Sequence, residues 1–421
     1  MLGRTQKQVR FPSYVNLRHD DCDMIFAMAA RASLEIDIGV GGRFHADQMF
    51  DGLQGAGHSV SLFTSYPPSR FPNVPSANIY SFLWPEIVFR GLSKLGFENQ
   101  GDLAKMVSFG QRMAKAIEER KKTADFFFGW SSFSLETLRL RAAKNTVVLR
   151  DSAHIQFQNR ILQEEYQRLN VPYPDRSLCE GRELEEYSLA DTIFVLSDFA
   201  KRTFVSAGIP EDKIHKLPLA VDLSRFKPIA KQVSQGPLKI LYFGNLSIQK
   251  GVHHLLEATQ ALSPSEAELT LIGAMDRQLL PICRKYSHAK ILPAMPQAEL
   301  AKVIPHFDLF VFPTLHDGFG QTLLQAMACG LVPIVSNHCG AADHVKSGEN
   351  GWVFPAGDVT VLKNLLREVI SQPDKLPALA RKAVQSAGGR PWSAYQSDLN
   401  TWIETRISGS VQKLRDAASA H

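Results

Sequence analysis

The sequence predicts an α/β protein that is built from two domains with parallel sheets. Its 421 residues exceed what one hydrophobic core normally supports, so two domains of ordinary size are expected. Short apolar segments alternate with segments of helical periodicity almost throughout, which is typical of parallel sheets covered by helices. The alternation restarts near residue 238, after a polar and broken stretch. The same architecture is therefore expected to occur twice.

The first half begins with the apolar strand Leu34-Glu-Ile-Asp-Ile-Gly-Val40. A glycine-containing loop at 41–45 follows, and Met49, Phe50 and Leu53 then share one face of a helix. The next strands are expected at residues 60–63, 124–128, 146–149, 192–196 and 214–217.

The second half repeats this order of elements. It opens with a strand at 238–243 and a helix at 252–262. The later strands are expected at residues 269–272, 309–312, 333–335 and 352–354. A last helix is expected to open at Arg390-Pro-Trp and to run to about Ile407.

These elements divide the chain into segments. The expected segments are a poorly ordered extension at 1–33, a first domain at 34–222, a linker at 223–237, a second domain at 238–389, a closing helix at 390–407 and a tail at 408–421.

Composition and cysteine spacing favour a cytoplasmic protein without a standard zinc site. No apolar run reaches the ~18 residues of a membrane-spanning helix, and residues 1–23 lack the apolar core of a signal peptide. The five cysteines are dispersed, which fits a reducing compartment. The spacing of His338, Cys339 and His344 matches no standard zinc site.

The charge is mildly basic, at +5 with a pI near 8.8, and no motif supports nucleic-acid binding. Basic residues gather in the first half, at Arg112, Lys115, Arg120, Lys121, Lys122, Arg139, Arg141, Lys144 and Arg150. Such a face either meets anionic lipid, as in peripheral membrane association, or is a solvated helix face.

The most informative segment runs from Phe312 to Gly330. Asp317 follows an apolar strand, and the turn Gly318-Phe319-Gly320 leads into a helix. A helix N-terminus offers unpaired N–H groups and a positive dipole end, so it suits a diphosphate. Gln325 adds a second hydrogen-bonding side chain eight positions after Asp317. The pattern is typical of a nucleotide-sugar site.

This segment resembles the donor-site motif of the family-4 retaining glycosyltransferases, the glycosyl transferases group 1. In that motif two glutamates usually flank Gly-Phe-Gly, whereas Asp317 and Gln325 occupy these places here. The turn Tyr242-Phe-Gly-Asn-Leu-Ser-Ile-Gln-Lys-Gly251 is similar to the family's diphosphate-gripping loop. Lys250 falls on the family's lysine, and Asn245 stands at its arginine.

The resemblance implies the GT-B fold, in which two Rossmann-like domains face each other across a cleft. The first domain then binds the acceptor and the second binds the nucleotide sugar. The last helix commonly crosses back onto the first domain, where Trp392 and Trp402 would anchor it.

The resemblance also implies the site residues. Lys250 would stabilise the diphosphate, Asp317 would hold the donor sugar, Gln325 the ribose, and His154 would reach the sugar from the opposite domain beside Asp151. The implied nucleotide-sugar-binding set is Gly41, Gly42, Gly244, Asn245, Lys250, Asp317, Gly318, Phe319, Gly320, Gln321 and Gln325, with His45 as a second histidine candidate. Transfer would be retaining and metal-independent, with the nucleoside-diphosphate sugar as co-substrate and no cofactor.

Several alternatives stay open at this stage. A sugar-nucleotide epimerase of the same fold and a degenerate binding protein are the two rivals, and Asn245, Gln249 and Gln325 favour the second. The acids of 183–191 indicate an exposed helix face more than a hydrolytic pair. The apolar stretch at 80–89 either binds a lipid-linked or polysaccharide acceptor or packs in the core.

Overall fold

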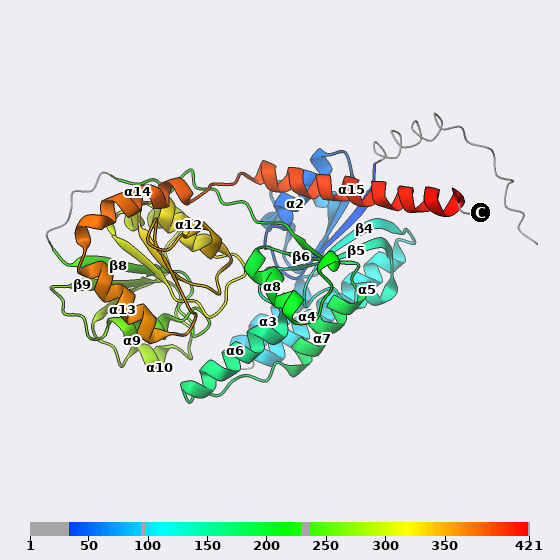
Figure 1. The fold of residues 1–421 in the computed structure, drawn as a ribbon. Helices are drawn as coiled ribbons and strands as arrows, with labels where there is room; N and C mark the ends of the chain where they lie inside the picture. Colours follow the sequence, from blue (N-terminus) through cyan, green and yellow to red (C-terminus); the bar gives the residue numbers. More distant parts are fainter. Residues whose placement is uncertain (1–32, 95–97, 230–235, 420–421) are drawn as a thin grey trace, which may run out of the picture.

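The computed structural model describes residues 33–94, 98–229 and 236–419, and it shows two α/β domains side by side (Figure 1). The extension expected at 1–33 lies almost wholly outside the described residues. None of the helices in the described ranges has the length and apolar character needed to span a bilayer.

The first domain contains a seven-stranded sheet in which every pairing is parallel, in the order β3-β2-β1-β4-β5-β6-β7. Its strands are β1 (Glu35–Val40), β2 (Ser59–Thr64), β3 (Ile79–Ser81), β4 (Ala124–Trp130), β5 (Ala143–Arg150), β6 (Thr192–Val195) and β7 (Ile214–Lys216). Its helices are α2 (Ala46–Gly55), α3 (Leu83–Lys94), α4 (Glu98–Glu119), α5 (Leu135–Leu140), α6 (Ile155–Arg168), α7 (Ser177–Leu189) and α8 (Asp198–Ser206). The central strands are buried on both faces because helices cover the sheet from both sides.

The second domain repeats the arrangement with a six-stranded parallel sheet in the order β10-β9-β8-β11-β12-β13. Its strands are β8 (Leu238–Phe243), β9 (Ala267–Ile272), β10 (Ala289–Leu292), β11 (Leu309–Phe312), β12 (Val332–Ser336) and β13 (Trp352–Phe354). Its helices are α9 (Val252–Thr259), α10 (Leu280–Cys283), α11 (Gln297–Val303), α12 (Gln321–Ala328), α13 (Val359–Ile370) and α14 (Leu376–Ser386).

Both sheets follow the doubly wound order, so the expectation of two Rossmann-like domains is confirmed. The strand order reverses between β1 and β4 in the first sheet and between β8 and β11 in the second. Ligands of open α/β sheets bind in the crevice beyond the carboxyl ends of strands at such points. The fold therefore places a candidate site after these four strands.

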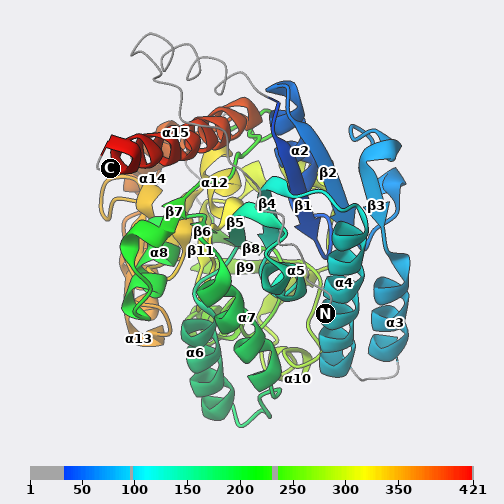
Figure 2. The same cartoon turned by 90° about the vertical axis from the view of Figure 1, so that its right-hand side faces the viewer.

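The last helix, α15 (Trp392–Ser419), crosses back onto the first domain, as expected (Figure 1 and Figure 2). Its Tyr395, Leu399 and Ile403 are fully buried in the core of the first domain. The ring centroids of Trp402 and Phe194 lie 4.8 Å apart. The helix continues past residue 407 through most of the segment expected to be a tail. The chain therefore ties its C-terminal end to its first domain.

Leu399→Ala is expected to lower the free energy of unfolding of the first domain by about 2–5 kcal/mol. Leu399 is fully buried between α15 and the first-domain sheet, so truncation loses apolar burial and leaves a cavity. Thermal unfolding of this variant is compared with Thr401→Ala, a change on the exposed side of the same helix. Equal melting temperatures would contradict the anchoring role of α15.

Candidate active site

A cavity of about 250 Å³ lies between the domains at the carboxyl ends of β4, β5, β8 and β11. The first domain lines it with Phe44, Trp130, Ser131, Leu149, Arg150, Asp151 and Ser152. The second domain lines it with Gln249, Lys250, Asp317 and Gly318. The cavity thus occupies the crevice that the strand order indicates.

On the second-domain side, an ammonium and a carboxylate meet in the cavity wall. Lys250 Nζ lies 2.7 Å from Asp317 Oδ2, and each side chain is 20% exposed. The other carboxylate oxygen of Asp317 accepts a hydrogen bond of 3.0 Å from the N–H of Phe319. Gly251, at φ 65°, lets the loop that carries Lys250 (the lysine loop) pass the end of β11. A Cβ at this position would lie 1.9 Å from Pro313 O. Lys250 is therefore held at the cavity by Asp317 and by the turn behind it.

The start of α12 lies directly after the cavity residue Gly318. Gly320 precedes the helix in the left-handed region at φ 86°, where a Cβ would lie 2.3 Å from Cys339 Sγ. No side chain caps this helix within the described ranges. Its first N–H groups have no intrahelical acceptor, and they carry the positive end of the helix dipole. The arrangement presents backbone donors and one ammonium to the same region.

The two domains touch at Gly318. A Cβ on Gly318 would lie 2.4 Å from Asp151 O and 2.7 Å from Ser152 Cα, which are backbone atoms of the first domain. Ser197 Oγ donates a hydrogen bond of 2.7 Å to Gly318 O. Ser152 Oγ lies 3.3 Å from His316 Nδ1. A glycine is therefore required at 318 for the domains to approach this closely.

The first-domain wall presents the carboxylate of Asp151, and the buried imidazole of His45 lies next to it. Trp130 Nε1 donates to Asp151 Oδ2 at 3.0 Å, and His45 Nδ1 lies 3.9 Å from the same oxygen. Burial lowers the pKa of His45, so its ring is neutral near pH 7. Asp151 Oδ1 and His45 Nε2 are buried, and neither has a hydrogen-bond partner within the described part of the chain. Of the two residues, Asp151 lines the cavity and His45 does not.

The structure corrects the expectation that His154 faces the cleft. Its side chain is 1% exposed, and it caps α6 by accepting a hydrogen bond of 3.3 Å from the N–H of Gln156. Its ring packs against the rings of Tyr187 and Phe204, and burial together with the charge of Arg150 lowers its pKa to about 4. His154 is absent from the residues that line the cavity, whereas Asp151, three positions earlier, is present.

Other predicted residues also lie outside the cavity lining. Gly41 gives room to Phe133, because a Cβ would lie 2.1 Å from that ring. The carbonyls of Gly41 and Gly42 accept hydrogen bonds from Ser65 and Thr64, so this loop is held by packing. Neither Gly41 nor Gly42 lines the cavity.

On the second domain, Gly244 adopts φ 134° and Asn245 is exposed, and neither lines the cavity. Gln325 is buried in α12, at 4% exposed, behind the first turn. Phe319 directly follows the cavity residue Gly318, and Gln321 is the first residue of α12. The structure thus brings Lys250, Asp317 and Gly318 together at the cavity, and the other predicted site residues do not line it.

Comparison with known proteins identifies the family of the chain. The sequence model described as Glycosyltransferase Family 4 matches residues 41–225, and that described as Glycosyl transferases group 1 matches residues 225–386. The chain is 27% identical over 192 residues to the putative colanic acid biosynthesis glycosyltransferase WcaL of Salmonella typhimurium. That match covers 42% of this chain and 47% of the relative, so the chain spans about half the length of this curated relative.

Solved structures share the fold over almost the whole chain. Sucrose-phosphate synthase from Thermosynechococcus elongatus has a TM-score of 0.63 at 17% identity, covering 90% of this chain and 97% of its own. The catalytic domain of starch synthase IV from Arabidopsis thaliana, bound to ADP and acarbose, has a TM-score of 0.62 at 15% identity, covering 90% and 100%. The chain has the GT-B fold and belongs to the glycosyl transferases group 1, the family-4 glycosyltransferases.

Proposed function

We propose that this protein is a retaining glycosyltransferase that moves a sugar from a nucleoside-diphosphate sugar to an acceptor hydroxyl. The Lys250–Asp317 contact of 2.7 Å in the interdomain cavity is the main support for this function. It lies beside the uncapped start of α12. A departing diphosphate gains negative charge in the transition state, and preorganised cations and N–H donors stabilise that charge.

In the proposed complex, the diphosphate lies between Lys250 and the N–H groups at the start of α12. Asp317 accepts hydrogen bonds from hydroxyls of the donor sugar, and it keeps Lys250 in place while it does so. The protein's own groups supply the positive charge, so the proposed transfer uses no metal ion and no cofactor. Gln325 holds the ribose from within α12.

Closure of the domains completes the proposed reaction chamber. Contact of Gly318 with the backbone of Asp151 and Ser152 narrows the cavity around the reacting atoms. Excluding water protects the activated donor from hydrolysis. The acceptor hydroxyl attacks from the face that the diphosphate leaves, and a phosphate oxygen takes its proton. The bond to the new oxygen then has the same configuration as the bond that breaks.

The first domain is the proposed acceptor side. Phe44 is 55% exposed at the cavity, where it stacks on Trp130 at 5.9 Å between ring centroids. Core packing does not account for the whole apolar stretch at 80–89, because Leu83, Trp84 and Ile87 of α3 are exposed. These side chains support a glycan or lipid-linked acceptor and peripheral contact with a membrane. A cytoplasmic location stays a prediction.

The experiment that tests this function is a thermal-shift panel of UDP, GDP, ADP and dTDP and their sugars, followed by an acceptor screen. Binding of one nucleotide is expected to raise the melting temperature in a concentration-dependent way. The transferred sugar is expected to keep its anomeric configuration by NMR. A complete lack of binding favours a degenerate binding protein, and interconversion of the nucleotide sugar without acceptor favours an epimerase.

Gln325→Glu is expected to tighten donor binding by about tenfold and to change the melting temperature less. A carboxylate accepts stronger, charge-assisted hydrogen bonds from ribose hydroxyls than an amide does. Calorimetric titration of the preferred nucleotide compares this variant with Gln297→Glu, an exposed change at the start of α11. A shift in melting temperature alone would remove Gln325 from the ribose site.

A further inference from the structure

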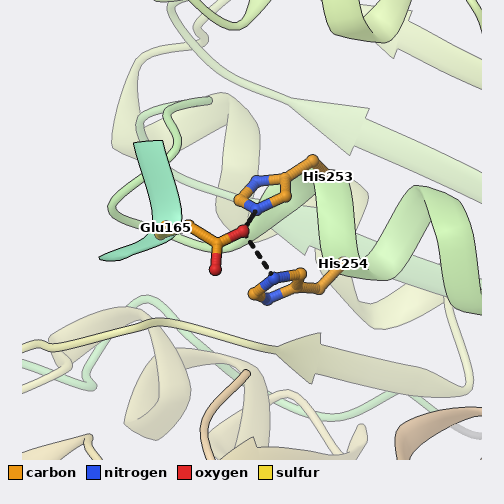
Figure 3. Close-up of side chains that lie close together, drawn as sticks. All are labelled: Glu165, His253 and His254. Carbon is orange, nitrogen blue, oxygen red and sulfur yellow. Dashed lines mark hydrogen bonds and ion pairs between the residues drawn. The ribbon is translucent and has the colours of Figure 1, made fainter. Parts of the chain in front are cut away.

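A second polar cluster, formed by Glu165, His253 and His254, joins the two domains (Figure 3). Glu165 comes from the last turn of α6, and His253 and His254 come from the first turn of α9. Glu165 Oε1 lies 2.7 Å from His253 Nε2 and 3.0 Å from His254 Nε2. Both imidazoles are 2% exposed and Glu165 is 8% exposed. Three potential ligand atoms, all within 4.8 Å of one another, therefore converge in a buried space.

The hydrogen bonding of this cluster is incomplete. The Nδ1 atoms of His253 and His254 are both buried, and neither has a partner within the described ranges of the chain. In a neutral imidazole, the hydrogen bond at one nitrogen decides which nitrogen carries the hydrogen. In the metal-free protein both Nε2–H groups donate to Glu165 Oε1, and when an ion displaces these hydrogens nothing bound at Nδ1 prevents them from residing there. Both Nε2 lone pairs are then available to a cation at the point where the rings meet Glu165.

We propose that Glu165, His253 and His254 form a binding site for a divalent transition-metal ion such as Zn²⁺, which links the two domains. Two imidazole nitrogens and one carboxylate oxygen are a ligand set that zinc accepts, with water in the fourth position. Zinc ligands lie about 2.0–2.2 Å from the ion and so about 3.3 Å from one another. The nitrogen–oxygen distances of 2.7 and 3.0 Å need to open by only a few tenths of an ångström.

Arg168 is the competitor for the carboxylate. Its Nη2 lies 2.6 Å from Glu165 Oε1, and its Nη1 lies 3.7 Å from Glu257 Oε2. The Arg168 side chain is 45% exposed, so it can keep its contact with Glu257 and turn away when an ion binds. The guanidinium and the ion repel each other, which means that Arg168 weakens metal binding. Removing this charge is expected to strengthen it.

The position of the site indicates a structural ion. None of the three residues lines the sugar cavity, so the ion does not enter the proposed transfer chemistry. However, α9 begins directly after Lys250 and Gly251. An ion bound to His253 and His254 therefore ties the lysine loop to α6 of the first domain. Metal binding favours the closed arrangement in which Lys250 faces the first domain.

To test this proposal, Co²⁺ and Zn²⁺ are titrated separately into the full chain after treatment with a chelator. Co²⁺ in a tetrahedral site absorbs visible light, and calorimetry with Zn²⁺ gives the stoichiometry and affinity. We expect one saturable ion per chain, bound at least ~10-fold more weakly by Glu165→Gln and His254→Asn. Arg168→Gln is expected to bind more tightly than the wild type. His306→Ala, which removes an exposed histidine outside the cluster, is expected to bind like the wild type.

Glu165→Gln is the deciding variant because it keeps the shape and a carbonyl acceptor for both imidazoles but is a poor metal ligand. Zn²⁺ is expected to raise the melting temperature of the wild type and to leave that of Glu165→Gln unchanged. If His254→Asn fails to fold, the opposite shifts in Glu165→Gln and Arg168→Gln carry the test. Absence of saturable binding, or equal affinity in the wild type and Glu165→Gln, overturns the proposal.

Discussion

The Lys250→Ala variant is expected to transfer sugar about 100-fold more slowly than the wild type, because removing one preorganised transition-state donor typically costs that much or more. Lys250 is the cation that the second domain brings to the cavity. Arg150 also lines the cavity, but its guanidinium is engaged by Glu183 at 3.2 Å and by Gln158 at 2.9 Å. The start of α12 alone would then face the departing diphosphate.

Steady-state kinetics with the preferred donor measure this effect, and kcat is expected to fall more than KM rises. Lys285→Ala, an exposed change in the same domain, is the matched control. Truncating Lys250 also leaves Asp317 unpaired, and its charge would repel a diphosphate. The double variant Lys250→Ala with Asp317→Asn, compared with Asp317→Asn alone, separates the two causes, since both variants lack that charge. A wild-type rate in Lys250→Ala would exclude the lysine from the mechanism.

Gly318→Ala is expected to lower the transfer rate about 100-fold, a loss typical of a misplacement of about 1 Å at a reacting centre. The added methyl group would lie 2.4 Å from Asp151 O and 2.7 Å from Ser152 Cα. Both are backbone atoms of the first domain, so no side-chain rotation relieves the clash. The domains must separate at this point, and the cavity opens to water.

The measurement combines the transfer rate with small-angle scattering, which reports the separation of the domains. The control is Gly181→Ala in α7, where an added Cβ would have no atom within 4 Å. We expect Gly318→Ala to be more extended and slow while Gly181→Ala behaves like the wild type. A compact and fully active Gly318→Ala would show that the contact at Gly318 does not limit the reaction.

The sequence was sufficient to predict most of the fold. Strands such as β1, β4 and β8 are apolar and buried on both faces, so each gives a run that stands out from its helical neighbours. β3 and β10 were missed because they are edge strands of three and four residues that are partly exposed. Their short, mixed patterns resemble loops. Their pairing depends on neighbouring strands that a local pattern does not contain.

The second-domain half of the candidate site could be predicted from the sequence. Lys250 and Asp317 each follow a central strand, β8 and β11, so parallel pairing brings the two loops to the same edge. The first-domain half was not predicted correctly. Local sequence shows a polar turn after β5 but not which side chain faces the cavity. Packing against Tyr187 decides that His154 turns inward and leaves Asp151 at the surface of the cavity.

The cluster of Glu165, His253 and His254 could not be predicted from the sequence pattern either. Glu165 and His253 lie 88 positions apart and belong to different domains. No spacing rule joins a carboxylate at the end of one helix to imidazoles at the start of another. The docking of α6 on α9 across the domain boundary brings them together.

A structure of the complex with the preferred nucleoside diphosphate decides whether a diphosphate binds between Lys250 and the start of α12. We expect a phosphate oxygen about 3 Å from Lys250 Nζ and others within the same distance of the N–H groups of Gln321 and Thr322. A nucleotide whose phosphates lie away from Lys250, with the α12 amides facing solvent, would show that the diphosphate does not bind there.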